Sequence, residues 1–427
     1  MKEGKKKKKA AEVQMTISRR TFCAGVIAGS GLRAMPAVVE GHLTPQTAVA
    51  ATGSHIGNLY PFVQAQADKS PLELSFLRPE FKDLRRWQTR ARSRIFDHLF
   101  YAPPRVAPQA QVLRRRDMGD YVEEYLTFQT SPDVRVPAYV LVPKKAERPA
   151  PGIVALHSHD GLYLWGKEKV IGAEQEHPHL TAFKQQRYGG KSIGAELARQ
   201  GYVVIAIDMF YWGERRMLLD DDPPAYRERP LTMTDKEIQA FNQRSSQNES
   251  LVGRSLFTAG TTWPGIVLWD DIRTLDYLAS RPEVDAKRLG CVGLSVGGYR
   301  SFLLAALDER IKTAVDVGWM TSFASQIKQH VVNTIGLSFH INGLYRYLDL
   351  PDMSALIAPR SIMVINGSQD RLFALDGVNA AFDKIARCYA KAGVPDRQRC
   401  RLFDAPHEFN LDMQREAWEW LGRSLRA

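Results

Sequence analysis

From residue 150 onward, short apolar runs alternate with stretches of helical periodicity, and this alternation limits the possible folds more than any other feature of the sequence. Six runs have the length and composition of buried strands, at 152–156, 202–207, 288–293, 311–317, 360–365 and 399–403. The intervening helix-like stretches lie at 192–200, 267–280, 297–307, 379–392 and 412–426. Apolar strands separated by helices indicate a mostly parallel sheet with helices on both faces. The sequence therefore predicts an α/β fold.

Further patterns predict the structure of residues 60–142 and of two polar insertions. Residues 60–105 are predicted to be helical, because apolar side chains recur at near-helical spacing until Pro103 and Pro104. The runs 121–129 and 136–142 are predicted strands joined by a turn. The polar segments 211–262 and 320–350 follow strand ends, where binding loops of such sheets lie, and we expect lid-like or cap-like insertions there.

The N-terminus has the pattern of an export signal. Arg19 and Arg20 precede a weakly apolar run, which resembles a twin-arginine signal, and Ala48-Val49-Ala50 fits a cleavage site before Ala51. Met15 is an alternative start, and a basic tail is the alternative interpretation. We expect a periplasmic or secreted protein that uses the twin-arginine machinery, with no stable membrane span, since Arg33 and several glycines interrupt the run.

The charge and the cysteines narrow the class of protein. The formal net charge is +11, but residues 1–50 contribute +6 of it, so the remaining excess is mild and does not favour a nucleic-acid partner. Four cysteines are too few for a disulfide framework, although Cys388 and Cys400 could pair. No Gly-rich phosphate loop and no cysteine pair with zinc spacing is present, so no cofactor and no metal are expected.

The segment Gly293-Leu-Ser295-Val296-Gly297 carries the strongest chemical signal. It follows an apolar strand and opens an apolar helix, which is the context of a G-x-S-x-G nucleophile elbow. The turn is so tight that the positions two before and two after the serine require glycine. The geometry exposes the Ser295 hydroxyl and directs the Val296 N–H toward a developing oxyanion.

A serine nucleophile needs a base that is oriented by an acid, and in this fold they follow in the order Ser, acid, His. Asp370 follows a strand directly, and His407 lies in the loop after the next strand. Asp376 and Asp404 are competitors for the acid. Ser295, Asp370 and His407 are therefore the predicted catalytic residues.

The second oxyanion donor is predicted in the loop that follows the strand at 152–156. That loop reads His157-Ser158-His159-Asp160-Gly161. We favour the backbone N–H of His159, with that of Ser158 as the next choice.

Taken together, these motifs resemble the α/β-hydrolase superfamily, and residues 75–427 are similar to its acetyl-xylan-esterase-like and dienelactone-hydrolase-like esterases. The similar stretches include Ala206-Ile207-Asp208 to Arg215, 281–285, 348–352, 358–360 and Pro406-His407-Glu408. The resemblance implies an α/β-hydrolase domain at 106–427 behind a helical extension at 51–105. It also implies cleavage of a carboxylic ester with a short acyl group, often acetyl on a carbohydrate. Dienelactone hydrolases use a cysteine where this chain has Ser295.

Three alternatives remain open on the sequence. The histidines His157 and His159, with His177 and His179 nearby, are compatible with a metal-dependent hydrolase. A prolyl-oligopeptidase-like peptidase also has Gly-x-Ser-x-Gly-Gly-Tyr, with Tyr299 in place here, but only about 100 residues precede the catalytic part, too few for a propeller. A non-catalytic α/β-hydrolase scaffold is the third.

Overall fold

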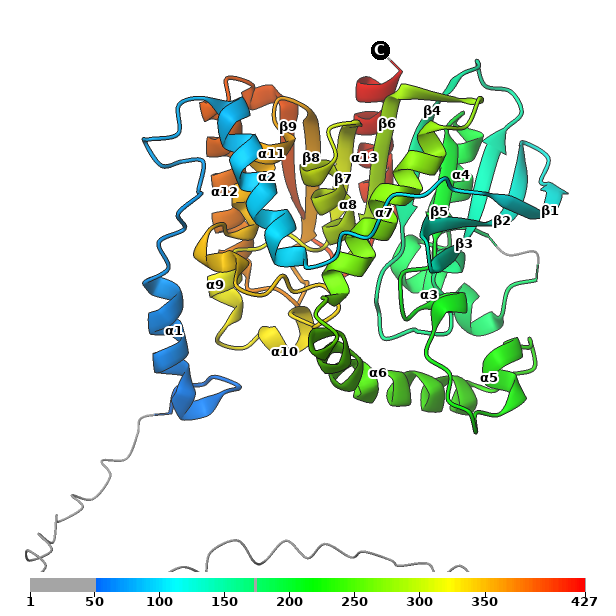
Figure 1. Ribbon diagram of the computed structural model, residues 1–427, viewed down its shortest axis with the longest axis horizontal. Helices are drawn as coiled ribbons and strands as arrows, with labels where there is room; N and C mark the ends of the chain where they lie inside the picture. The colour runs from blue at the N-terminus through cyan, green and yellow to red at the C-terminus, as the bar shows by residue number, and fades with distance from the viewer. Residues whose placement is uncertain (1–50, 173–174, 427) are drawn as a thin grey trace, which may run out of the picture. The chain divides into compact units, whose positions relative to one another are not determined.

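A nine-stranded sheet organises the computed structural model, which describes residues 51–172 and 175–426 (Figure 1). The strand order is β1-β2-β3-β5-β4-β6-β7-β8-β9. The strands are β1 Gln111–Asp117, β2 Tyr121–Ser131, β3 Val134–Pro143, β4 Ala150–Leu156, β5 Val203–Ile207, β6 Val284–Leu294, β7 Ile311–Val317, β8 Ser361–Gly367 and β9 Gln398–Phe403. Strands β1 to β3 pair antiparallel, as do β3 and β5, and all other pairs are parallel. The predicted α/β fold is confirmed.

All eight predicted strands are present, and β1 is the addition. Its side chains are almost all exposed, so it lacks the apolar pattern that identifies a buried strand. Arg115 and Arg116 of β1 instead form ion pairs with Glu124 and Glu123 of β2.

Helices cover both faces of the sheet. They are α1 Tyr60–Asp68, α2 Leu84–Leu99, α3 Pro178–Tyr188, α4 Ile193–Arg199, α5 Pro224–Glu228, α6 Asp235–Thr258, α7 Trp263–Ala279, α8 Val296–Leu307, α9 Phe323–Gln326, α10 Val331–Thr334, α11 Ser354–Ile357, α12 Leu375–Lys391 and α13 Leu411–Leu425. Helices α7 and α8 pack on one face and α4 and α13 on the other. Successive side chains of a strand alternate between the two cores, as Ile153 and Val154 of β4 do.

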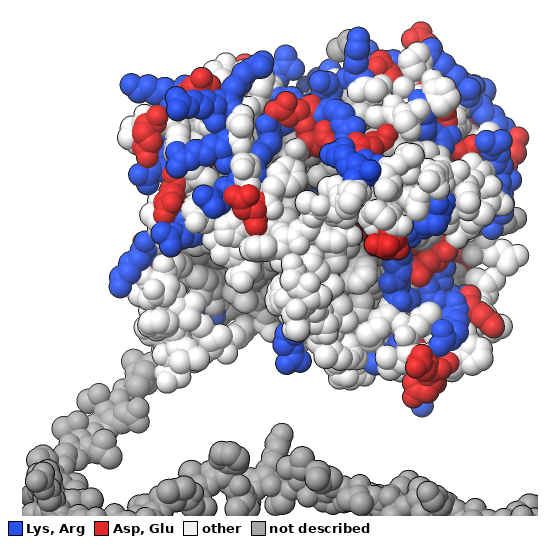
Figure 2. Space-filling model, in the orientation of Figure 1, with Lys and Arg blue, Asp and Glu red and all other residues white. Residues whose placement is uncertain are grey.

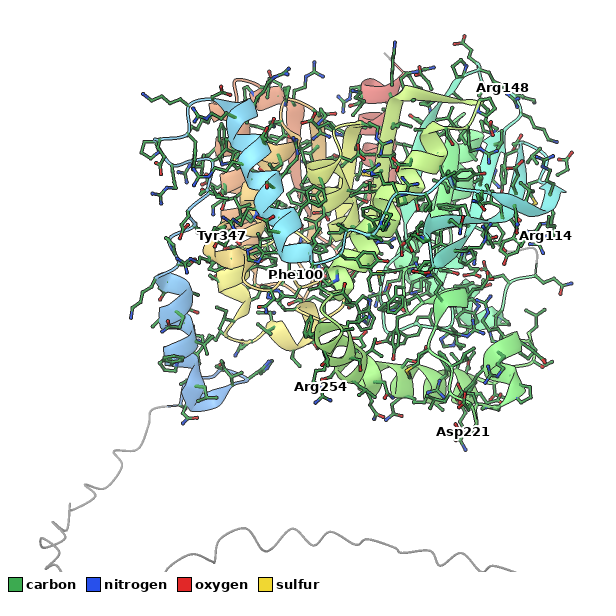
Figure 3. All side chains as sticks on the ribbon, viewed as in Figure 1. Phe100, Arg114, Arg148, Asp221, Arg254 and Tyr347 are labelled. Atoms are coloured by element: carbon green, nitrogen blue, oxygen red, sulfur yellow. The ribbon has the colours of Figure 1, made fainter. Side chains whose placement is uncertain are left out.

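The predicted helical segment 60–105 is two helices separated by a non-helical stretch at 69–83. Pro71 and Pro79 lie in that stretch, and proline removes a backbone donor and restricts its neighbours. Helix α2 begins at Leu84 and is capped by Asp83, whose carboxylate accepts a hydrogen bond from the Arg86 N–H. It buries Trp87 and packs beside Tyr347, so it is an integral part of the unit that begins at Ala51 (Figure 3).

The two expected insertions form helical segments beside the sheet. Residues 211–262 contain α5 and the long helix α6, and residues 320–350 contain α9 and α10. Arg254 of α6 and Asp221 before α5 lie toward the same end of the molecule in Figure 3. Cys388 and Cys400 are free thiols, so they form no disulfide with each other.

The predicted export motif at Arg19-Arg20 and the predicted cleavage site at 48–50 lie outside the described residues. Within the described residues, no helix is both long and apolar enough to cross a membrane. On the face in Figure 2, basic and acidic side chains are interspersed in the upper half, while the lower middle is largely uncharged.

Candidate active site

Ser295 stands at the junction of β6 and α8 in a strained backbone conformation. Its φ and ψ angles are 59° and −128°, values that a residue with a side chain rarely adopts. Strain of this kind costs about 1–3 kcal/mol and persists where the surrounding structure imposes it. The Ser295 N–H donates to the Val317 carbonyl at 2.7 Å, which fixes the turn to the end of β7.

The two elbow glycines are required by close backbone contacts. A Cβ on Gly293 would lie 2.4 Å from the carbonyl carbon of Gly297, and one on Gly297 would lie 2.0 Å from the Leu156 oxygen. Neither contact can be relieved by a side-chain rotation, because each involves backbone atoms. This explains the spacing of the motif in atomic terms.

We expect Gly297→Ala to lower the free energy of unfolding by about 2–4 kcal/mol, because its methyl group would push β4 away from the elbow. Urea unfolding of the full chain measures the change. Gly422→Ala in α13 is the matched control: its new methyl group would have the Tyr202 hydroxyl as nearest atom at 3.9 Å. That control should raise stability by about 0.5–1 kcal/mol, because alanine favours a helix interior. Equal stability of the two variants would contradict the steric explanation.

His407 and Asp370 form a partly buried pair. The Nδ1 atom of His407 lies 2.6 Å from Oδ2 of Asp370, and Oδ1 of Asp370 accepts from the Leu372 N–H at 2.9 Å. The competitors lie elsewhere: Asp404 accepts from Ser368 and Gln369, and Asp376 accepts from the N–H of the next residue. The structure thus brings Asp370 to the histidine.

The other nitrogen of His407, Nε2, is not engaged by Asp370. Nε2 is buried and has no hydrogen-bond partner among the described residues. His407 and Ser295 line one cavity of about 360 Å³, whose wall also includes Val296 and His159. A histidine held by a carboxylate therefore shares a cavity with the Ser295 hydroxyl. General-base activation of a nucleophile requires these two groups to come within hydrogen-bond reach.

The predicted oxyanion loop lies beside the elbow. Leu156 at the end of β4 is in register with Gly293 of β6, so His157, Ser158 and His159 follow directly alongside the nucleophile turn. The His159 N–H has no acceptor among the described residues. Val296 is the first residue of α8, where helical N–H groups lack intrahelical partners.

The four histidines of the metal alternative do not converge on one point. His157 is fully buried, with Nδ1 at 2.9 Å from the Ser158 carbonyl and Nε2 at 3.0 Å from the Met209 N–H. Burial holds the pKa of His157 well below its ordinary value, so the ring is neutral. His159 bonds Glu249, His177 the Met233 carbonyl and His179 Asp235.

A different group of carboxylates, Glu168, Asp208 and Glu214, has the spacing of a metal site within the described residues. The ammonium group of Lys167 lies within it, 2.7 Å from Asp208 and in contact with Glu214. These carboxylates raise the pKa of the buried Lys167 and keep it charged. The cluster is therefore an ion network centred on Lys167. Glu214 belongs to it as one of the carboxylates that contact this lysine.

The neighbouring Arg215 binds the Asp270 carboxylate and the Asp208 carbonyl. Both residues of the 214–215 pair thus stabilise the loop after β5.

Arg187 was not predicted from the sequence, and it joins the loop that carries His407 to the loop that carries Asp160. Its Nη1 donates to the His407 carbonyl at 2.8 Å, and its Nε donates to Asp160 of the oxyanion loop at 3.0 Å. Arg187 is on α3, 220 residues before His407, and no local pattern in the sequence marks such a contact.

A second missed residue, Asp316, is buried in β7 beneath the elbow. Neither of its carboxylate oxygens has a hydrogen-bond partner among the described residues. Desolvation raises its pKa to about 8, so it is mostly protonated at neutral pH. The sequence signal that could have identified Asp316 is the presence of a charged residue in the middle of an apolar strand.

The aromatic side chains divide between core and cavity. Trp212 and Trp263 are fully buried and pack with Tyr211, so they form part of the core. Trp319 and Phe339 are in contact and line the cavity beside Ser295.

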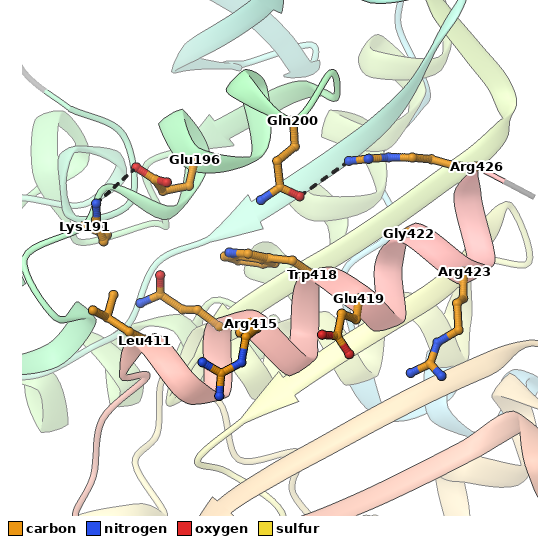
Figure 4. Close-up of a pocket in the computed structure, with 11 residues that line it drawn as sticks. Lys191, Glu196, Gln200, Leu411, Arg415, Trp418, Glu419, Gly422, Arg423 and Arg426 are labelled. Carbon is orange, nitrogen blue, oxygen red and sulfur yellow. Dashed lines mark hydrogen bonds and ion pairs between the residues drawn. The ribbon is translucent and has the colours of Figure 1, made fainter.

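A larger groove of about 750 Å³ lies on the face of the sheet that α4 and α13 cover, between α13 and the region of α4 (Figure 4). Trp418 and Arg415 face it, and Lys191 pairs there with Glu196. None of the predicted site residues lines this groove, so the chemistry is assigned to the smaller cavity.

Comparison with known proteins agrees with this architecture. The model of the dienelactone hydrolase family matches residues 186–335, and an Abhydrolase family model matches residues 57–224. The protein named "Putative hydrolase YtaP" of Bacillus subtilis strain 168 is 28% identical over 335 residues, which are 78% of this chain and 98% of that protein.

Two solved structures extend the comparison. One is that of "a putative acetyl xylan esterase" from Bacteroides fragilis NCTC 9343, with a TM-score of 0.60 and 18% identity over 81% of this chain and 82% of that one. The other is a glucuronoyl esterase from Solibacter usitatus, with a TM-score of 0.57 and 16% identity over 84% and 99%.

The fold and the comparisons together identify an α/β-hydrolase fold, and the family models and the curated relative it matches are those of hydrolases. The resemblance to dienelactone-hydrolase-like and acetyl-xylan-esterase-like proteins is confirmed.

Proposed function

We propose that this protein hydrolyses a carboxylic ester through an acyl-enzyme formed on Ser295. The observation that carries the proposal is the position of Ser295. It is held at a strained φ of 59° in one cavity with His407, whose far nitrogen is fixed 2.6 Å from Asp370. A non-catalytic scaffold would not need a strained serine beside a histidine that is held by a carboxylate.

The chemistry follows from these positions. His407 Nε2 takes the Ser295 proton as Oγ attacks the ester carbon, and the N–H groups of Val296 and His159 stabilise the oxyanion. His407 then gives the proton to the leaving alcohol as the C–O bond breaks. A water attacks the acyl-enzyme in the same way, releasing the carboxylic acid and restoring Ser295. Asp370 fixes the imidazole tautomer and stabilises the imidazolium.

The cavity suits a small acyl group and a polar alcohol. Its volume of about 360 Å³ is at the lower end for a ligand pocket. Trp319, Phe339 and Leu372 supply an apolar part of the wall, while Ser246, Glu249 and Asn333 supply a polar part. We propose an acetyl-type ester of a carbohydrate, in line with the esterase names of the structural neighbours.

The test is covalent labelling with a fluorophosphonate, followed by peptide mass spectrometry. We expect a single adduct on Ser295, and loss of p-nitrophenyl acetate turnover in proportion to the labelled fraction. Within a p-nitrophenyl ester series, acetate should give a higher kcat/KM than octanoate. Labelling elsewhere with full residual turnover would refute the proposal. The Ser361→Ala variant, which removes a hydroxyl bonded to Ser424 away from the cavity, should label normally.

We also propose export through the twin-arginine machinery to the periplasm or the outside. The support is the sequence around Arg19 and Arg20 and the cleavage pattern at 48–50. Replacing both arginines by lysine should retain the protein in the cytoplasm, as cell fractionation would report. Unchanged export of the double variant would contradict this route.

A further inference from the structure

Lys169 is a buried lysine for which the catalytic scheme has no role. Its side chain is fully buried in the 3-10 turn Lys167–Lys169 that follows the oxyanion loop. It forms no ion pair among the described residues, in contrast to Lys167 and Lys184, which bind carboxylates. Its two hydrogen bonds go to the carbonyls of Ser158 and His159, at 2.8 and 2.9 Å. A buried charge without a carboxylate partner is costly, and such exceptions concentrate at functional sites.

The Ser158 carbonyl is held from two sides. Besides Lys169, it accepts a hydrogen bond from Nδ1 of His157 at 2.9 Å. The Met209 N–H donates to the other ring nitrogen, which fixes the tautomer that has its proton on Nδ1. Two buried donors therefore determine the orientation of this one carbonyl.

That carbonyl belongs to the same peptide group as the His159 N–H. The peptide bond is trans, so the N–H points away from the C=O and from both donors. Rotating the peptide would break two buried hydrogen bonds and exchange the directions of its C=O and N–H groups.

We propose that Lys169 is a positioning residue that locks the Ser158–His159 peptide so that the His159 N–H is presented as the second oxyanion donor. This inference rests on the proposed function, because it assigns a role within the same acyl transfer. In its protonated form the Lys169 side chain also polarises the peptide it binds, which strengthens the His159 N–H as a donor.

The surroundings of the ammonium group fit this role. Burial lowers the pKa of Lys169 to about 7, while the charges of Asp160, Asp208 and Glu168 act in the opposite direction. The ring of Phe183 on α3 lies 5.7 Å from Nζ, and the neighbouring His157 stays neutral. Asp160 is itself bonded to Arg187 and Ser158, and Asp208 to Lys167, so the two loop carbonyls remain the direct partners of Lys169.

The test compares Lys169→Met with Lys184→Met in the full chain. Lys184 is the matched control, since it is a buried lysine that binds the Ile171 carbonyl, Ser192 and Glu176 without touching the oxyanion loop. For Lys169→Met we expect kcat for p-nitrophenyl acetate to fall about 10- to 100-fold with KM within about threefold, since one oxyanion donor is worth on the order of 10²–10³. The inhibition constant of a trifluoromethyl ketone, which forms an oxyanion on Ser295, should rise by a similar factor. Both quantities should change less than about threefold in Lys184→Met.

Lys169→Gln provides the rescue, because its amide can still donate one hydrogen bond; we expect a kcat between those of Lys169→Met and the parent. Melting temperatures of all variants separate folding from positioning. Parent-like kcat in both Lys169 variants, or equal losses in Lys184→Met, would overturn the inference. So would the absence of a melting transition in both Lys169 variants, since that would mean a folding role. If Ser295→Ala retained turnover, the proposed function itself would fail, which is a distinguishable result.

Discussion

Replacing Ser295 by alanine will lower kcat for ester hydrolysis by about 10⁴- to 10⁶-fold, the range expected when a serine nucleophile is removed from a triad. The reason is that the acyl-enzyme can no longer form, whereas the oxyanion donors and the substrate cavity remain. Steady-state turnover of p-nitrophenyl acetate by the purified chain measures the loss.

The Ser295→Ala variant should fold like the parent. Alanine keeps the Cβ at the strained position, so the melting temperature should change little. The Ser361→Ala variant controls for loss of a partly buried serine hydroxyl on β8 and should keep parent-like turnover. If Ser295→Ala turned over ester as fast as the parent, an acyl-enzyme on this residue would be excluded.

Asp370→Asn should lower kcat by about 10³- to 10⁴-fold with a nearly unchanged structure. An asparagine can donate its amide N–H to His407 Nδ1, which would favour the tautomer with the proton on Nε2. That nitrogen then cannot accept the Ser295 proton. Kinetics with p-nitrophenyl acetate and the rate of fluorophosphonate labelling should fall together, because both need the activated hydroxyl.

Asp404→Asn is the matched control, since Asp404 lies three residues before the histidine but bonds Ser368 and Gln369. We expect its kcat to stay within about threefold of the parent value. A large loss in Asp404→Asn together with an active Asp370→Asn would reverse the assignment of the acid.

The predictable part of the fold was the part that has a local pattern. Runs such as Tyr202–Ile207 are apolar throughout because β5 is buried on both faces, and composition alone reveals that. Strand β1 was missed because its side chains are charged and exposed, and the break between α1 and α2 was missed although Pro71 and Pro79 lie in it.

The candidate site also divides into a part with a local sequence pattern and a part that depends on tertiary contacts. The elbow is local, because Gly293, Ser295 and Gly297 must be close in sequence to form one tight turn between a strand and a helix. The pairing of His407 with Asp370, and not with Asp404, depends on how the loops after β8 and β9 meet, which spacing does not encode.

The sequence by itself determined the alternation of strands and helices from residue 150 onward, the position of the tight turn at Ser295, and the order of Ser295, Asp370 and His407 along the chain. These features were accessible because periodicity and turn geometry act over a few residues. Tertiary structure alone decided that His157 is a neutral buried ring and that Lys167 fills a cluster of carboxylates. It also decided that Arg187 joins the His407 and Asp160 loops, and that Lys169 binds the Ser158 carbonyl. Each of these depends on which charges and carbonyls share a buried volume, and burial sets whether a polar group is neutral, paired or held in one orientation.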